Sequence, residues 1–151
     1  MATYKLKNFN KILPELVQGE VIQAGAFAMP PGGMKRQMMG GAFGVIGQVV
    51  AAKGQGTAGS FELPRRFILG LTNQRLLFVK PDALLGRPKS ILYAIPVNQI
   101  ASAGLGDKGA MSQQAVFALK SGEQVIVEVG KVRVKAWMVD LLEKLQPMLT
   151  A

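Results

Sequence analysis

The chain has no cysteine and no histidine among its 151 residues. Without cysteine it can form no disulfide, no thiolate metal site and no thiol nucleophile, which fits a reducing compartment. Without histidine it lacks the commonest general acid–base side chain and the commonest metal ligand, so the usual hydrolytic triads cannot be assembled. We therefore expect a protein that is not an enzyme and that holds no metal and no cofactor.

Acidic residues are also few. The chain has 9 Asp and Glu against 18 Lys and Arg, which gives a formal net charge of +9. This excess favours anionic partners such as lipid head groups, nucleic acid or acidic proteins. It is spread along the chain without a basic run, so a solvated basic surface and a dedicated anion site both stay open. Strand aromatics such as Phe67, Phe78 and Phe117 come without an RNA-binding motif, so nucleic acid is the disfavoured partner.

Two familiar signals are missing or incomplete. The first ten residues contain no apolar segment of the secretory type, so we expect a cytoplasmic protein, with peripheral attachment to a membrane as the alternative. Residues 54–59 match Gly-x-Gly-x-x-Gly letter for letter, but Pro64 and a segment without helical periodicity follow them. A dinucleotide site needs a helix there, so this stretch is interpreted as a flexible linker.

The length fits a single domain over residues 1–151. A short helix is predicted over 8–18, with Asn10 as its cap and Pro14 inside it, followed by a first strand over 20–29. Asn73-Gln74 and Ser121-Gly122 are expected to turn between strands, and Gly70 to leave room for another backbone. The further strands are predicted at 67–72, 76–79, 91–95, 100–105, 115–119 and 124–129.

A final amphipathic helix is predicted over 131–148, because Val134, Trp137, Leu141 and Leu145 recur at helical spacing until Pro147 limits the helix. Trp137 and Leu141 are expected in the core. Seven strands followed by one helix predict a mainly β fold, either an antiparallel barrel or a pair of bent sheets closed by the helix. Helices that alternated with strands would instead have indicated a βαβ fold.

Four segments in order resemble the bacterial pleckstrin-homology-like domains, including the short ones of the GRAM and YokE-like groups. They are Gly19–Ile22, Leu69–Val79 with its Leu-Thr-Asn-x-Arg-Leu core, Ile95–Ile100 and the Ser-Gly turn before the last strand and helix. The resemblance implies two nearly orthogonal sheets of about seven strands capped by a C-terminal helix. It also implies a scaffold that binds lipid head groups, peptides or partner domains rather than one fixed activity. Eukaryotic relatives that bind phosphoinositides use basic residues near the first hairpin, with a spacing that differs from the basic residues here.

The segment between the first two predicted strands, residues 30–65, is far longer than an ordinary loop. A helical wheel over it gives two neighbouring stripes. The small stripe, suited to close packing, contains Gly40, Gly44, Gly47 and Ala51, and the apolar stripe contains Met39, Phe43, Ile46 and Val50. Each glycine costs a helix about 1 kcal/mol relative to alanine, so this helical insertion needs support from its own barrel, another subunit or a membrane surface.

Self-association or docking on a protein partner through this insertion is the function that the sequence favours. The alternative is binding to anionic membranes through the insertion and its basic flanks. In that case Phe43, Ile46 and Val50 would enter the lipid. The electrostatic part of either contact would consist of Lys35, Arg36, Lys53, Arg65 and Arg66.

Overall fold

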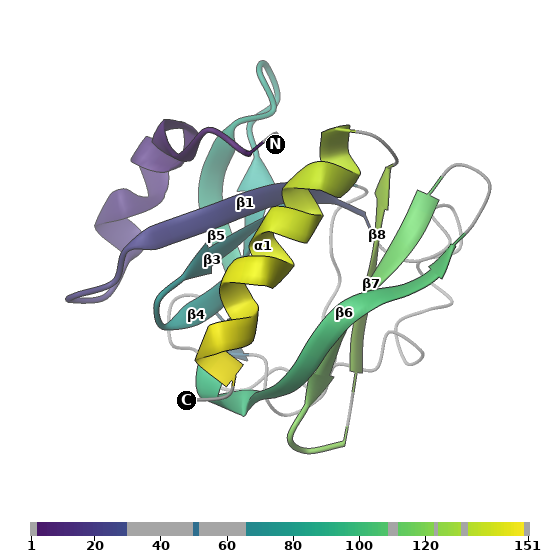
Figure 1. The fold of residues 1–151 in the computed structure, drawn as a ribbon. Coiled ribbons are helices and arrows are strands. Elements are labelled where there is room, and N and C mark those ends of the chain that lie inside the picture. The colour runs from purple at the N-terminus through teal and green to yellow at the C-terminus, as the bar shows by residue number, and fades with distance from the viewer. Residues whose placement is uncertain are drawn as a thin grey trace.

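A computed structural model describes residues 3–29, 50–51, 66–108, 112–122, 124–130 and 133–149 (Figure 1). Two short 3-10 helices, eight strands and one α-helix follow one another in this part of the chain. In order they are η1 (Leu6–Glu15), β1 (Ile22–Ala28), β2 (Val50–Ala51), β3 (Phe67–Thr72), β4 (Arg75–Pro81), β5 (Pro88–Pro96), η3 (Val97–Gln99), β6 (Ile100–Lys108), β7 (Ser112–Leu119), β8 (Gln124–Gly130) and α1 (Arg133–Leu149).

The strands form two antiparallel sheets. The first has the order β1-β3-β4-β5 with the two-residue β2 at the outer edge of β5, and the second has the order β6-β7-β8. The backbones of Met29 and Glu128 exchange hydrogen bonds of 2.9 and 2.8 Å and join the sheets at one corner. The mainly β fold of two sheets with a C-terminal helix is confirmed. The closed barrel is wrong for the described residues, because the ladder between their two sheets stops at that corner.

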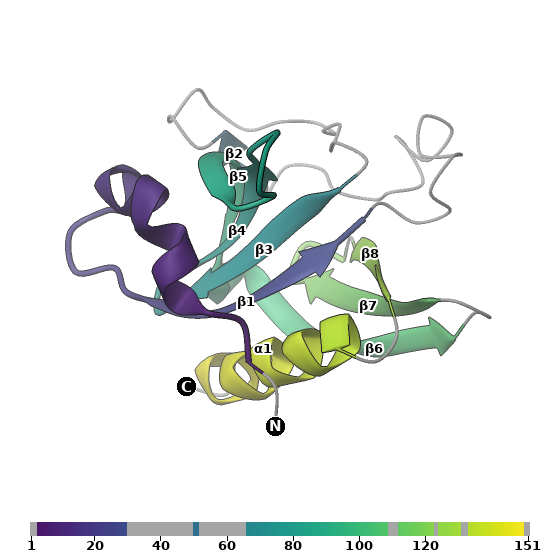
Figure 2. The ribbon, with the colours of Figure 1, turned by 90° about the horizontal axis from the view of Figure 1, so that it is seen from above.

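The first sheet is covered on both faces, which explains why all six residues of β3 are buried. Alternate side chains of a strand point to opposite faces. Phe67, Leu69 and Leu71 therefore enter the core between the sheets, whereas Ile68 enters a second apolar cluster on the outer face. Figure 2 shows η1 on that outer side and β6 to β8 on the other. In β7 every second residue is buried instead, as expected for a sheet with one wet face.

The N-terminal helix is held on the outer face by the ring of Phe9, which is fully buried. Gly25 and Gly70 are paired across β1 and β3 directly beneath this ring. A Cβ atom would lie 2.8 Å from Phe9 at Gly25 and 3.1 Å from it at Gly70, closer than packed side chains normally come. The sequence correctly indicated a close approach at Gly70, but the neighbour is an aromatic ring rather than a backbone.

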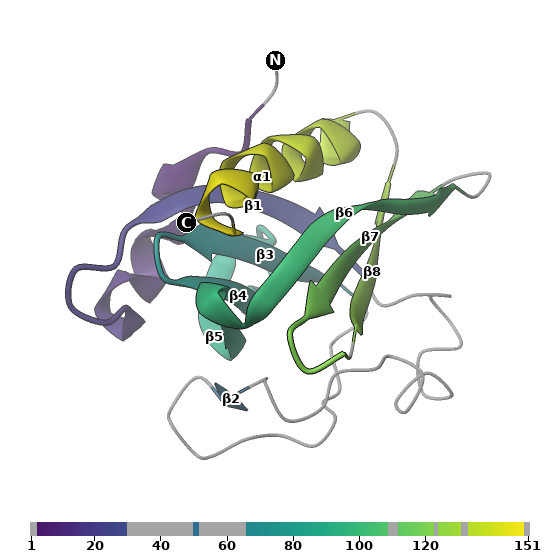
Figure 3. The ribbon, with the colours of Figure 1, turned by 60° about the horizontal axis from the view of Figure 1, so that its bottom comes forward.

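Helix α1 crosses from the first sheet to the second, as Figure 3 shows. Its fully buried residues include Leu141 and Leu145, which join the core between the sheets, while Trp137 is partly buried and contacts both apolar clusters. Lys144 Nζ donates to the Gln23 carbonyl of β1 at 3.2 Å, and Gln146 Nε2 donates to the Ala103 carbonyl of β6 at 2.7 Å. These contacts fix the helix across the opening between the sheets.

Several predicted boundaries need correction. The first helix begins at Leu6, with Lys5 at its N-cap, so Asn10 lies inside the helix and does not cap it. At the other end of the chain α1 contains Pro147, as the predicted range 131–148 did, and ends at Leu149, one residue later than predicted. A proline has no N–H, so it cannot make the backbone hydrogen bond to the preceding turn of the helix, and near a helix end the loss of that one bond is tolerated. The remaining elements overlap their predicted ranges, with strand ends that differ by up to three residues.

The predicted insertion at 30–65 lies outside the described residues except at its middle. There Val50 and Ala51 pair antiparallel with Ala94 and Tyr93 of β5, so the chain is extended at these two positions and the predicted helix does not include them. A physical reason is that the edge of β5 offers backbone partners, and a β-branched valine is better suited to a strand than to a glycine-rich helix.

Candidate functional site

The predicted contact residues fall mostly outside the described part of the chain. Arg66 is exposed immediately before β3, and Val50 and Ala51 form β2. The residues outside the described ranges are Lys35, Arg36, Gly40, Phe43, Gly44, Ile46, Gly47, Lys53 and Arg65. Their role as a contact surface therefore stays a prediction.

Arg66 lies at the corner where the two sheets meet. It lines an open hollow of about 310 Å³ together with Phe27 and Met29 from the end of β1 and Glu128 and Gly130 from β8. Ala28 is paired with Phe67, so the described strands on either side of the 30–65 segment end beside each other. A basic side chain thus stands where that segment returns to the fold.

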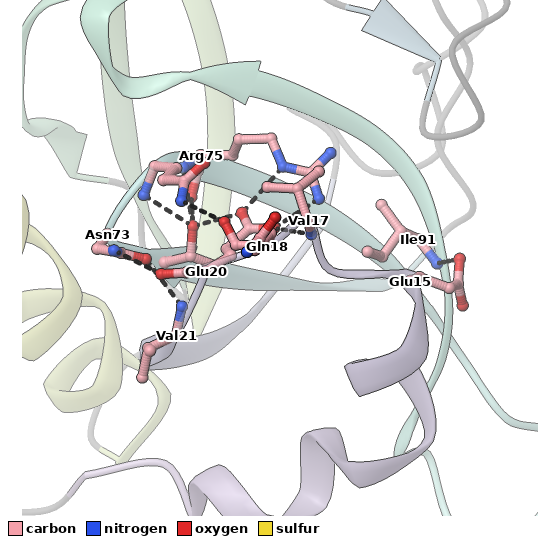
Figure 4. Close-up of polar contacts among 11 residues, drawn as sticks. Glu15, Val17, Gln18, Glu20, Val21, Asn73, Arg75 and Ile91 are labelled. Carbon is pink, nitrogen blue, oxygen red and sulfur yellow. Dashed lines mark hydrogen bonds and ion pairs between the residues drawn. The ribbon is translucent and has the colours of Figure 1, made fainter.

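The Leu-Thr-Asn-x-Arg-Leu motif forms a polar clasp at the opposite end of the sheet (Figure 4). Arg75 makes two charge-assisted hydrogen bonds to Glu20, from Nη2 to Oε1 at 2.8 Å and from Nε to Oε2 at 2.9 Å. The Thr72 hydroxyl donates to Glu20 at 2.6 Å, and Asn73 Nδ2 donates to the Gly19 carbonyl at 3.1 Å. The motif thus ties the β3–β4 turn to the segment before β1, and its polar groups are occupied by the fold.

Glu20 is the buried charge in this clasp. Burial alone would raise the pKa of its carboxyl, but hydrogen bonds from Arg75, Thr72 and the Val17 N–H outweigh that effect and hold the pKa below its usual value. A carboxylate whose charge is fully compensated is suited to holding structure. Catalysis by Glu20 is not indicated, since its oxygen atoms are already bonded to protein donors.

The loop between β4 and β5 is a second candidate surface, which the sequence analysis did not single out. Leu84 and Leu85 in this loop are 93% and 68% exposed. The loop is nevertheless ordered by Asp82, whose Oδ1 accepts the N–H groups of Leu84, Leu85 and Gly86 at 3.0, 2.6 and 3.0 Å. The bond from Leu85 contributes most to lowering the pKa of Asp82. The loop projects above the rest of the described chain in Figure 1.

Two open hollows lie beside the loop and share Asn8, Leu85 and Arg87 in their walls. The first, of about 430 Å³, reaches Tyr4, Phe27 and Trp137, whose rings contact one another at centroid distances of 5.2 to 5.9 Å. The second, of about 460 Å³, reaches the N-terminal helix. We call the two hollows with Leu84 and Leu85 the dileucine groove. The exposed basic residues along it are Lys5, Lys7, Lys11 and Arg87.

The described residues of the groove offer apolar contacts and positive charge but no pair of nucleophile and general base. In the described part of the chain no group of three Asp, Glu, His or Cys residues could hold a metal ion. None of the helices described there combines the length and apolar character that a membrane span requires. A sequence signal for the groove existed, since two consecutive leucines stand between the turn formers Pro81-Asp82 and Gly86, where burial in a strand is not expected.

No protein-family model matches the chain, and no curated protein matches it by sequence. Among solved structures it is similar to a DUF1696 family protein with a pleckstrin-homology domain from Shewanella loihica PV-4. The TM-score is 0.53, and the alignment covers 98% of this chain and 96% of that one at 12% sequence identity. The similarity supports a pleckstrin-homology-like fold and, at that identity, carries no information on activity.

Proposed function

We propose that the chain is a non-enzymatic bacterial binding module, related to the short GRAM and YokE-like pleckstrin-homology-like domains. Its 30–65 insertion mediates self-association or docking on a protein partner. The observation that supports this function is the pairing of Val50 and Ala51 with β5, which ties the middle of the insertion to the edge of the first sheet. Edge strands are natural sites for pairing between chains. β2 is the edge strand on this side of the described sheet, a position at which a second chain can pair.

Light scattering tests this proposal with a variant in which residues 30–65 are replaced by a short Gly-Ser turn. The paired ends Ala28 and Phe67 allow such a turn to close a β1–β3 hairpin, and the two-residue β2 is removed together with the insertion. If the insertion mediates self-association, we expect the full chain to have a mass of two or more 16.1 kDa units. If it binds a partner protein, we expect the mass of the mixture with that partner to exceed that of one chain. The variant should be a monomer that retains its circular dichroism spectrum. A folded variant that still forms an assembly with the same number of subunits would contradict the role of the insertion.

Binding to anionic membranes through the insertion and its basic flanks is a second candidate, supported by the exposed position of Arg66 where the insertion ends. Co-sedimentation with phosphatidylglycerol and with phosphatidylcholine vesicles separates the two functions. Arg66→Glu should reduce pelleting with the anionic vesicles. The matched control, Lys120→Glu, changes the net charge equally at an exposed site beside the opposite end of the sheet. Equal, negligible pelleting of the natural chain with both vesicle types would exclude this candidate.

A further inference from the structure

The dileucine groove carries an inference that is independent of the insertion. Its two leucines are exposed although their backbone is firmly held, because Asp82 fixes the loop and Asp82 N–H donates to the Arg87 carbonyl at 2.8 Å. The order of the loop therefore does not depend on packing of the leucines. Removing apolar side chains from water favours binding, so a partner that covers both leucines would gain affinity without a cost for ordering the loop.

The shape of the groove favours a protein segment over a flat lipid surface. Leu85 lines both hollows, and each is within the size range of about 300 to 1,000 Å³ that binding pockets occupy. One hollow is walled by Tyr4, Phe27 and Trp137, which are the aromatic residue types that commonly anchor protein interfaces. Side chains of a partner segment can fill both hollows, whereas a flat bilayer meets the protruding leucines and leaves the hollows empty.

The charge of the groove selects the partner. Four exposed cations lie along it, and the carboxylate of Asp82 is occupied by three N–H groups of its own loop. A second copy of the chain is a poor match, because the whole chain carries a formal charge of +9. Its apolar 30–65 segment likewise contains four basic residues and one acidic residue, Glu62. Complementarity therefore calls for acidic residues on a different protein.

We propose that the dileucine groove is a docking site for an acidic, apolar segment of a partner protein. Apolar side chains of that segment occupy the hollows beside Leu85, and its carboxylates lie against Lys5, Lys7, Lys11 and Arg87. This contact is separate from the one proposed for the insertion, and either can fail without the other.

The experiment is a selection of displayed random peptides of about 12 residues against the full chain, followed by titration of the winning synthetic peptide. Trp137 is the single tryptophan and lines the groove, so its fluorescence reports occupancy directly. We expect peptides rich in Asp or Glu with Leu, Ile or Phe, and binding that weakens as salt rises. The double substitution Leu84→Ser with Leu85→Ser should weaken binding at least about tenfold, and Arg87→Glu should weaken it further at low salt.

Val21→Ser is the matched control, because Val21 is a 60% exposed apolar residue at the other end of β1 and should leave binding unchanged. The variant without residues 30–65 should also bind the peptide normally, which separates this site from the insertion. The proposal is overturned if no peptide is enriched, or if the winners are not acidic. It is equally overturned if the double substitution Leu84→Ser with Leu85→Ser leaves the peptide affinity unchanged. A membrane site is indicated instead if no peptide binds and the same double substitution abolishes pelleting with phosphatidylglycerol vesicles, and that result also overturns the proposal.

Discussion

Replacing Glu20 by glutamine tests whether the Leu-Thr-Asn-x-Arg-Leu motif holds the fold. The Glu20 side chain is fully buried and that of Arg75 is 17% exposed, so the substitution leaves a largely buried guanidinium without its counter-charge. Breaking a buried ion pair costs about 3 to 5 kcal/mol. Glutamine retains one acceptor oxygen, and water can reach the edge of Arg75, so we expect about 2 kcal/mol and a fall in Tm of about 4 to 8 °C for a domain of this size.

The pH dependence of this loss distinguishes the charge from the shape of the side chain. The pKa of Glu20 is lowered in the folded state, so its contribution is complete above the unfolded value of about 4.3 and disappears as the pH falls through the folded value. The difference in unfolding free energy between the natural chain and Glu20→Gln should therefore be constant from about pH 7 to 5 and shrink below about pH 4.

Urea unfolding followed by Trp137 fluorescence at pH 7 and pH 3 measures this difference. The control is Glu143→Gln on the exposed face of α1, which should change stability by less than about 0.5 kcal/mol. A loss for Glu20→Gln that is equally large at both pH values would refute the electrostatic explanation. A loss no greater than that of Glu143→Gln at pH 7 would refute the structural role of the clasp itself.

Two further predictions concern the N-terminal helix and the β4–β5 loop. Gly25→Ala places a Cβ atom 2.8 Å from Phe9 and should lower the free energy of unfolding by about 1 to 3 kcal/mol in urea titration, and an unchanged value would show that the Phe9 ring moves aside freely. Asp82→Ala removes the acceptor of three loop N–H groups, so amide exchange of Leu84 to Gly86 should quicken while that of β7 stays unchanged. The protection of these amides in the natural chain, taken relative to the intrinsic exchange rate at each pH, should also fall as acid protonates Asp82, because that carboxyl has a lowered pKa and accepts these bonds as an anion. Exchange at Leu84 to Gly86 that is the same in both proteins would mean that Asp82 does not order the loop.

The turns, most strands and the final helix could be predicted from sequence because each rests on contacts between near neighbours. The alternation in β7 and the positive φ of 98° at Gly122 are local properties of the chain. The i, i+3, i+7 and i+11 spacing of the final helix likewise required no knowledge of its surroundings, and Leu141 and Leu145 are buried as their spacing indicated.

What only the tertiary structure decided depends on residues that are distant in sequence. The ring that Gly25 and Gly70 accommodate belongs to Phe9, and the partner of Arg75 lies 55 residues away. The same holds for β2, which is a strand because the edge of β5 lies beside it. It also holds for the two sheets, which meet at one corner and close no barrel within the described residues. The exposure of Leu84 and Leu85 was equally hidden, because the sequence shows which side chains are apolar but not whether anything in the fold covers them.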